Sequence, residues 1–160
     1  MTATMTREVR AVVGTYAASS GPSPATALTL DHAARHVRRV CLTCDDGTTV
    51  ALDLPEPVSL RNRDRLVLDD GREVEVVAAA ESLFEVRSRD LAHLSELAWH
   101  LGNRHAPAQI EPDRILIARD PVLARMLEGL GATVREVEEP FEPVRGAYHA
   151  HSHGHADHSH

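Results

Sequence analysis

One run of the sequence combines a helical repeat of apolar residues with two strong signals for where that helix must end. Gly102 and Asn103 follow the run, and both residue types tolerate the left-handed backbone that commonly ends a helix. Pro107 then keeps Ala106 out of the helical conformation. We therefore expect Arg104 and His105 to lie just beyond a helix end, with the His105 imidazole turned outward. The apolar residues of the run recur every three or four positions and predict one buried helical face: Leu91, Leu94, Leu97, Ala98 and Leu101.

The elements predicted around this helix follow the order β-α-β-β-α-β, which is typical of a ferredoxin-like sandwich. Ser88 or Asp90 can cap the first helix, and Asp120-Pro121 can open the second. We assign this domain to residues 79–147. Its predicted strands are Leu83–Arg87, Gln109–Glu111, Arg114–Ala118 and Thr133–Val137.

Residues 1–78 lack helical periodicity and instead alternate short strand-like runs with turn signals. The predicted turns are Asp45-Asp46-Gly47, Pro55-Glu56-Pro57 and Asp69-Asp70-Gly71. This pattern predicts an N-terminal all-β domain, a small barrel or sandwich, and so an α+β chain overall. The predicted strands are Arg7–Gly14, Ala27–Leu30, Val37–Thr43, Thr48–Leu54, Arg65–Leu68 and Glu73–Ala78.

The last part of the sequence has a composition unlike that of either domain. Residues 138–143 are expected to be extended, with Phe141 packed against the second domain. Residues 148–160 offer almost nothing to bury, so we expect a disordered tail. Imidazole is a ligand for nickel, zinc and copper, and the alternating pattern therefore predicts metal binding rather than an expression tag or a solubilising tail. Six of the eleven histidines lie there: His149, His151, His153, His155, His158 and His160.

His105 alone cannot hold a divalent ion tightly, and a lone histidine is more often a surface or core residue than a ligand. A symmetric dimer could bring two copies of His105 together, and the tail could supply further ligands. His93, Glu96 and His100 share one helix face and form either an auxiliary site or, as we favour, its solvated side. His32 and His36 are interpreted as solvated. Cys41 and Cys44 could be a redox pair or half a zinc site, but two half-buried strand residues are favoured.

Charge and hydropathy exclude several classes of function. The formal net charge is −7, and all 17 basic residues are arginines dispersed among carboxylates, which argues against nucleic-acid binding. No apolar run approaches the roughly 20 residues of a membrane span, and no signal peptide is visible, so we expect a soluble cytoplasmic protein. The sequence also lacks the common catalytic motifs for hydrolysis, phosphate binding and dinucleotide binding, and no enzyme is predicted.

Several motifs together resemble the UreE family, the nickel metallochaperones of urease assembly. They are Gly102-Asn103-Arg104-His105 with Pro107, Gln109 and Ile110 behind it, then Pro140-Phe141-Glu142-Pro143, Gly146-Ala147-Tyr148 and the histidine-rich end. The resemblance implies a peptide-binding-like first domain and a metal-binding second domain. It further implies a homodimer with His105 as a metal ligand at the interface. Some family members carry further histidines at a strand-to-helix turn, but Ile117–Pro121 has none here.

The function that this resemblance implies is delivery of Ni²⁺ to apo-urease, in complex with the urease accessory GTPase and the apo-urease/accessory assembly. Zn²⁺ or Cu²⁺ can take the place of Ni²⁺ on the same imidazoles. Binding requires neutral imidazole and should weaken as the pH falls through about 6.5. Two alternatives stay open: a general nickel, zinc or copper buffer with no urease role, and a peptide-binding adaptor whose tail is incidental.

Overall fold

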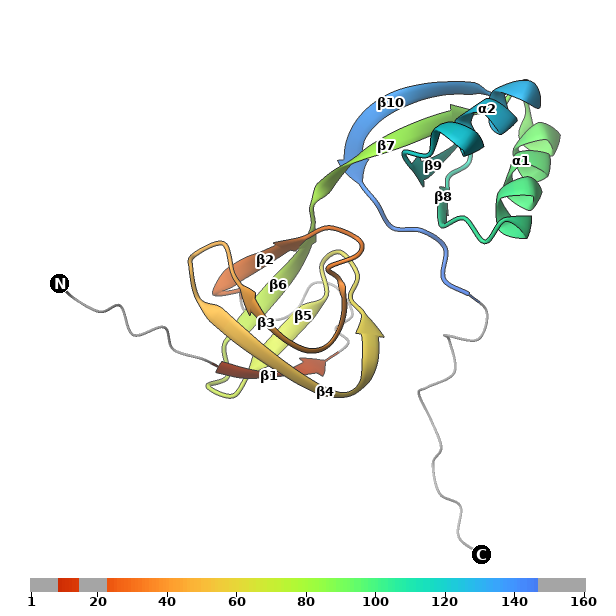
Figure 1. Ribbon diagram of the computed structural model, residues 1–160. Helices are drawn as coiled ribbons and strands as arrows, with labels where there is room; N and C mark the ends of the chain where they lie inside the picture. The colour runs from red at the N-terminus through yellow and green to blue at the C-terminus, as the bar shows by residue number, and fades with distance from the viewer. Residues whose placement is uncertain (1–8, 15–22, 147–160) are drawn as a thin grey trace, which may run out of the picture. The chain divides into compact units, whose positions relative to one another are not determined.

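A computed structural model describes residues 9–14 and 23–146, and the chain forms two compact units (Figure 1). Unit 1 contains the residues up to Leu83 together with Val137–Glu142, and unit 2 contains Phe84–Glu136 and the residues from Pro143 onward. The six tail histidines lie outside the described residues. No helix in the described part of the chain is long and apolar enough to cross a membrane.

Unit 1 is built on one mixed six-stranded sheet with the strand order β2-β6-β5-β1-β4-β3. β1 runs parallel to β4 and β2 runs parallel to β6, whereas the other neighbouring pairs are antiparallel. In β5, β6 and the first half of β4, alternate residues are buried, as expected for strands with one face in the core. The strands are β1 (Val9–Gly14), β2 (Thr26–Leu30), β3 (His36–Thr43), β4 (Thr49–Ser59), β5 (Arg65–Leu68) and β6 (Glu73–Ala78).

The core of unit 1 is mainly aliphatic and is drawn from strands β2 to β6 and from two loop residues, Cys44 and Leu60. Leu28, Val50, Leu66, Val74 and Val76 are each completely buried. The short strand-like runs that predicted most of these strands thus supply most of the core that holds the sheet together. The α+β class is confirmed, because two sheets are combined with two helices, while the barrel or sandwich form of the first domain stays a prediction.

The predicted turn at Pro55-Glu56-Pro57 is wrong, because β4 continues through these residues. The register explains how the strand accommodates two prolines. Val37 pairs with Val58, but Arg39, two residues further on, pairs with Asp53, so β4 has extra residues between these two pairs. Proline cannot donate a ladder hydrogen bond and is tolerated at such a bulge. The prolines therefore interrupt the pairing without ending the strand.

Unit 2 contains the predicted succession of elements, with the second sheet in the order β10-β7-β9-β8. If the four strands of this sheet are numbered by their order in the sequence, their order across the sheet is 4-1-3-2. Both helices contribute to a single aliphatic core with the central strands. The elements are β7 (Ala80–Arg87), α1 (Leu91–Asn103), β8 (Ala108–Ile110), β9 (Arg114–Ala118), α2 (Pro121–Gly129) and β10 (Thr133–Pro140). Two of these strands extend into unit 1, since residues 80–83 of β7 and 137–140 of β10 belong to that unit.

Each helix begins at an aspartate whose side chain accepts hydrogen bonds from the first turn. Asp90 accepts from the His93 amide at 2.8 Å, and Asp120 accepts from the Val122 and Leu123 amides at 2.8 and 3.2 Å. Such caps satisfy amides that have no partner within the helix, and each contributes about 1 kcal/mol. The cap of α1 is thus Asp90 rather than Ser88.

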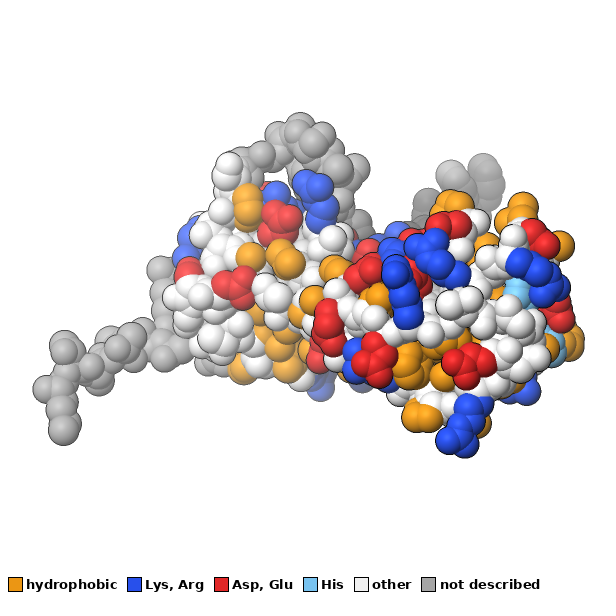
Figure 2. All heavy atoms as spheres, turned by 90° about the horizontal axis from the view of Figure 1, so that it is seen from above, with side chains coloured by type: hydrophobic (Ala, Val, Ile, Leu, Met, Phe, Trp, Pro, Cys, Tyr) orange, Lys and Arg blue, Asp and Glu red, His pale blue; other side chains and the backbone are white. Residues whose placement is uncertain are grey.

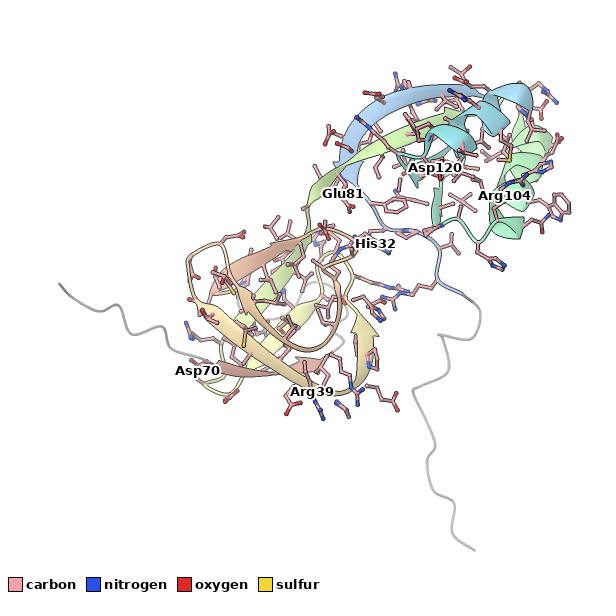
Figure 3. The ribbon with its side chains drawn as sticks, in the orientation of Figure 1. His32, Arg39, Asp70, Glu81, Arg104 and Asp120 are labelled. Atoms are coloured by element: carbon pink, nitrogen blue, oxygen red, sulfur yellow. The ribbon has the colours of Figure 1, made fainter. Side chains whose placement is uncertain are left out.

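The expectation that Phe141 packs on the second domain is wrong, because Phe141 belongs to unit 1. Its side chain is only 2% exposed, and its ring lies edge-on to the ring of His32 at 5.3 Å. The buried Arg35 guanidinium donates to the Phe141 carbonyl and, at 3.1 Å, to a Glu142 carboxylate oxygen. A second glutamate, Glu81, accepts a hydrogen bond from the His32 amide at 2.7 Å (Figure 3). Contacts between residues more than 100 positions apart decided this placement, and local sequence carries no sign of them.

Candidate metal centre

His105 follows the C-terminus of α1 in a left-handed conformation, with a φ angle of 53°. Its amide donates to the Gly102 carbonyl at 3.0 Å, and the Ala106 amide donates to the Leu101 carbonyl at 3.1 Å. This pair of hydrogen bonds is the Schellman arrangement, in which the first residue past the cap is left-handed and is usually glycine. Here that position is occupied by a histidine.

The predicted role of Gly102 and Asn103 as the left-handed helix stop is therefore wrong, because both residues belong to α1 itself. The helix continues two residues further than predicted, and Arg104 is the cap. A non-glycine residue in a left-handed conformation costs on the order of 1 kcal/mol, although histidine tolerates it better than most side chains. The hydrogen bonds of the motif hold His105 in this conformation.

The surroundings of His105 suit a positively charged ligand and leave its imidazole available. The side chain is exposed and has no hydrogen-bond partner among the described residues. The aligned peptide dipoles of a helix place partial negative charge at its C-terminus, which favours cations nearby. Arg104 already uses this property, since its guanidinium donates to the His100 carbonyl at 3.1 Å.

A shallow hollow of about 250 Å³ lies beside His105, between the end of α1 and the start of α2. Figure 3 labels one lining residue from each side, Arg104 and Asp120. Arg104 and Ala106, the sequence neighbours of His105, both line the hollow, and most of the lining is apolar. Sequence reasoning missed this feature, because the hollow forms between two segments that are ten residues apart in the sequence. Its lining residues are Arg104, Ala106, Pro107, Ile117, Ala118, Asp120 and Leu123.

The described residues contain no complete metal site around His105. Among them, no group of three or more His, Cys, Asp or Glu side chains could hold a metal ion. A full set of ligands for His105 would therefore include groups from outside the described residues or from another copy of the chain. The predicted ligands His149, His151, His153, His155, His158 and His160 all belong to residues 147–160, outside the described residues.

His93, which was expected on the solvated side of α1, is instead 1% exposed. Its Nδ1 atom accepts a hydrogen bond from the Arg89 amide at 3.2 Å, so Nε2 carries the proton and donates to the Leu130 carbonyl at 2.8 Å. With both nitrogens engaged, His93 connects the start of α1 with the end of α2. It is part of the core and cannot join Glu96 and His100 in an auxiliary site.

The two histidines and two cysteines of unit 1 differ in their exposure and in their contacts. His36 is exposed and its Nδ1 lies 2.9 Å from Ser59 Oγ, whereas His32 is partly buried against Phe141. Burial, followed by the nearby Arg35, lowers the pKa of His32. Cys41 is exposed on β3 but Cys44 is 4% exposed, and burial raises the pKa of its thiol to about 11. Since a metal or redox site needs a thiolate, Cys44 is poorly suited to either.

Charged side chains on unit 2 neutralise one another. The Glu85 carboxylate is completely buried beneath three arginines: it pairs with Arg87 at 2.7 Å and Arg114 at 3.4 Å, and it accepts a hydrogen bond from Arg135. The hydrogen bond from Arg135 is the main reason that the pKa of Glu85 lies below its ordinary value. Figure 2 likewise shows a face on which arginines alternate with carboxylates, rather than a basic stripe.

Comparison with known proteins covers nearly the whole chain. The model of the UreE urease accessory protein C-terminal domain matches residues 81–160, and the model of the N-terminal domain matches residues 10–79. The chain is 58% identical over 144 residues to the urease accessory protein UreE of Mesorhizobium japonicum, covering 89% of this chain and 74% of the relative. It is 58% identical over 139 residues to that of Rhizobium meliloti (85% and 90%), and 56% identical over 140 residues to that of Agrobacterium fabrum (88% and 86%).

Proposed function

This chain belongs to the UreE family of urease accessory proteins, and from that premise we propose that it is a nickel metallochaperone. It binds Ni²⁺ and delivers the ion to apo-urease while the urease active site is assembled. Its family makes it an accessory protein rather than an enzyme. Its partners are the urease accessory GTPase and the apo-urease/accessory complex, and it works in the cytoplasm.

The observation that carries this proposal is the placement of His105. The left-handed backbone of this residue is held by two helix-terminal hydrogen bonds, and its exposed imidazole lies at the negative end of a helix. Because the backbone is already held in place, only the side chain loses conformational freedom when the metal binds. The strain is also consistent with a binding role, since unfavourable backbone conformations concentrate at functional sites.

A symmetric homodimer supplies the second imidazole, because a two-fold axis near His105 places the same residue on both sides of the interface. Exposed apolar side chains support an interface on unit 2. Of the six large apolar side chains that are exposed among the described residues, five belong to unit 2, and exposed apolar surface commonly marks such interfaces. They are Leu91, Trp99, Ile110, Val122 and Val144, whereas Val67 belongs to unit 1.

The histidine-rich tail supplies the remaining ligands and captures nickel first. Ligands on a pliant segment exchange easily, which suits a protein that must release its cargo, while tethering keeps them at high local concentration. Zn²⁺ and Cu²⁺ are expected to compete for the same imidazoles.

Calorimetric titration of Ni²⁺ into four proteins tests this proposal. They are the native chain, a variant with all six tail histidines changed to serine, His105→Ala in that variant, and His36→Ala in that variant as a matched control. We expect the tail variant to keep one tight site per dimer, which His105→Ala removes and His36→Ala leaves intact. If the tail variant loses all binding, the protein is a metal buffer and the proposal is wrong.

The pH dependence provides an independent check on the ligand type. At pH 5.5 most ordinary imidazoles are protonated and cannot bind metal, whereas at pH 7.5 they are neutral. The affinity for Ni²⁺ should therefore be much lower at pH 5.5. Equal affinity at the two pH values would contradict histidine ligation.

A further inference from the structure

A two-residue segment from late in the sequence, Phe141 and Glu142, is held on unit 1 by side-chain contacts. The segment directly follows β10 and belongs to no helix or strand. Pro140 and Pro143 flank it, and proline lacks an amide hydrogen and keeps the residue before it extended. The Phe-Glu segment is therefore held by the groups that it meets on unit 1.

The groups that receive the Phe-Glu segment belong to two turns of unit 1, one before β3 and one before β5. Arg35, which is only 3% exposed, donates to the Phe141 carbonyl and, at 3.1 Å, to Glu142 Oε1. The Asn62 amide donates to the same Oε1 atom at 2.7 Å. The ring of His32 meets the Phe141 ring edge-on, with the centroids 5.3 Å apart (Figure 3). A carbonyl, a carboxylate and an aromatic ring are thus each recognised by a separate group.

The two turns are held in place by hydrogen bonds that do not involve the Phe-Glu segment. The amide and Nε of Arg35 donate to the Asp31 carbonyl at 3.1 and 3.3 Å, and the Leu60 amide donates to the Arg35 carbonyl at 2.8 Å. The guanidinium is therefore already oriented toward a carboxylate. A buried guanidinium without an acidic partner is strongly unfavourable. The site consequently needs an occupant that carries a carboxylate.

The Phe-Glu segment has the character of a bound peptide rather than of a core element. Phe141 is buried but is not a member of the aliphatic core cluster of unit 1. The Glu142 side chain is 41% exposed, so the ion pair with Arg35 can be reached from solvent. The segment also lies 80 or more positions along the chain from the residues that bind it.

We propose that these two turns form a recognition site for an extended peptide with a phenylalanine followed by a glutamate, and that Phe141 and Glu142 occupy it as an internal ligand. The contacts are made to a backbone carbonyl, a phenyl ring and a carboxylate, which a Phe-Glu pair on another protein also offers. The internal segment is then an autoinhibitory contact, and a partner with this sequence displaces it and docks on unit 1. This inference goes beyond nickel delivery and does not depend on His105.

Fluorescence anisotropy with a labelled peptide of residues 138–144 tests the site. In the native chain the internal segment competes at an effective concentration on the order of 1 mM, because it is tethered. Glu142→Gln weakens the internal ligand by removing its charge while keeping its shape. We expect the peptide to bind the full-length Glu142→Gln protein at least about tenfold more tightly than the native chain. Glu56→Gln, at an exposed position elsewhere in unit 1, is the matched control and should bind as the native chain does.

Changes in the peptide and in Arg35 test which groups are recognised. The peptide with Phe141→Ser or with Glu142→Gln should bind the Glu142→Gln protein at least about tenfold more weakly than the native peptide. Arg35→Lys in that protein should weaken binding similarly, since an ammonium cannot reproduce the planar fork of the guanidinium. Thermal unfolding keeps the test decisive if Glu142→Gln lowers stability. The native peptide should raise the unfolding midpoint of this protein, whereas the Phe141→Ser peptide should not.

Three results would overturn the inference. If the native peptide binds the Glu142→Gln protein no better than the native chain, the segment is a permanent part of unit 1. If Phe141→Ser in the peptide does not weaken binding, the site does not recognise the ring. If the Glu142→Gln protein self-associates and the peptide does not reverse this, the segment is exchanged between copies of the chain. Nickel titration keeps the two proposals separate, because Glu142→Gln should leave the site at His105 unchanged.

Discussion

The two ends of α1 each carry a histidine, and the two side chains have opposite surroundings. Near the start of the helix, His93 is buried and both of its nitrogens are hydrogen-bonded to backbone groups. Just beyond the end, His105 is exposed on strained backbone, and its ring has no hydrogen-bond partner among the described residues. An imidazole can bind metal only if a nitrogen lone pair is available. The same residue type thus stabilises the fold at one end and can bind a ligand at the other.

The largest expected difference between these two histidines concerns nickel affinity. In the variant without tail histidines, His105→Ala should weaken Ni²⁺ binding at least about 100-fold, since even residues that merely support metal ligands contribute 10- to 100-fold. His100→Ala, on the same helix, is the matched control and should change the affinity little. Calorimetric titration measures both, and equal losses would mean that His105 is not the specific ligand.

The second difference concerns stability. His93→Leu should lower the free energy of unfolding by about 2–3 kcal/mol, because the Arg89 amide and the Leu130 carbonyl lose their partner while the site stays buried. His105→Ala should change it far less. Urea denaturation followed by the fluorescence of Trp99, the single tryptophan, measures both values. A His93→Leu protein of native stability would show that the buried hydrogen bonds contribute nothing.

A smaller effect of opposite sign is expected from glycine at position 105. His105→Gly should raise the free energy of unfolding by about 0.5–1 kcal/mol, because glycine adopts the left-handed conformation without strain. The same variant should lose the tight nickel site, so stability and binding change in opposite directions. His105→Val should be less stable than the native chain, and the reverse order of the two variants would contradict a strained His105.

The smallest effect concerns His32 in unit 1, whose surroundings are intermediate between those of His93 and His105. Burial lowers the pKa of His32 in the folded state. As the pH falls below about 6.5, His32 is therefore protonated in the unfolded chain before it is protonated in the folded chain. Stability contributed by neutral His32 is complete above that pH and is lost as the pH falls toward the lowered folded-state pKa. His32→Gln should therefore show a smaller drop in urea midpoint from pH 7.5 to 5.5 than the native chain. His36→Gln, at an exposed position, should keep the native drop.

The positions of the helices and most strands could be predicted from sequence because their signals are local. Asp120 with Pro121 identified the start of α2, and strand β9 has the predicted limits, Arg114–Ala118. The candidate ligand His105 was likewise found from a short motif beside a helix end. The burial of His93 was not predictable in this way, since its partner Leu130 lies 37 residues away. The tail histidines and the dimer stay predictions.

The sequence by itself determined where the elements begin, the family to which the chain is similar, and the histidine that stands beyond α1, because helix periodicity, capping and motifs depend on residues a few positions apart. Only the tertiary structure decided which residue takes the left-handed position, that β4 continues through its prolines, and that Phe141 is buried in unit 1 beside Arg35. These outcomes depend on hydrogen bonds and packing between distant segments. Such contacts exist only once the chain has folded, and so no local pattern of residues could reveal them.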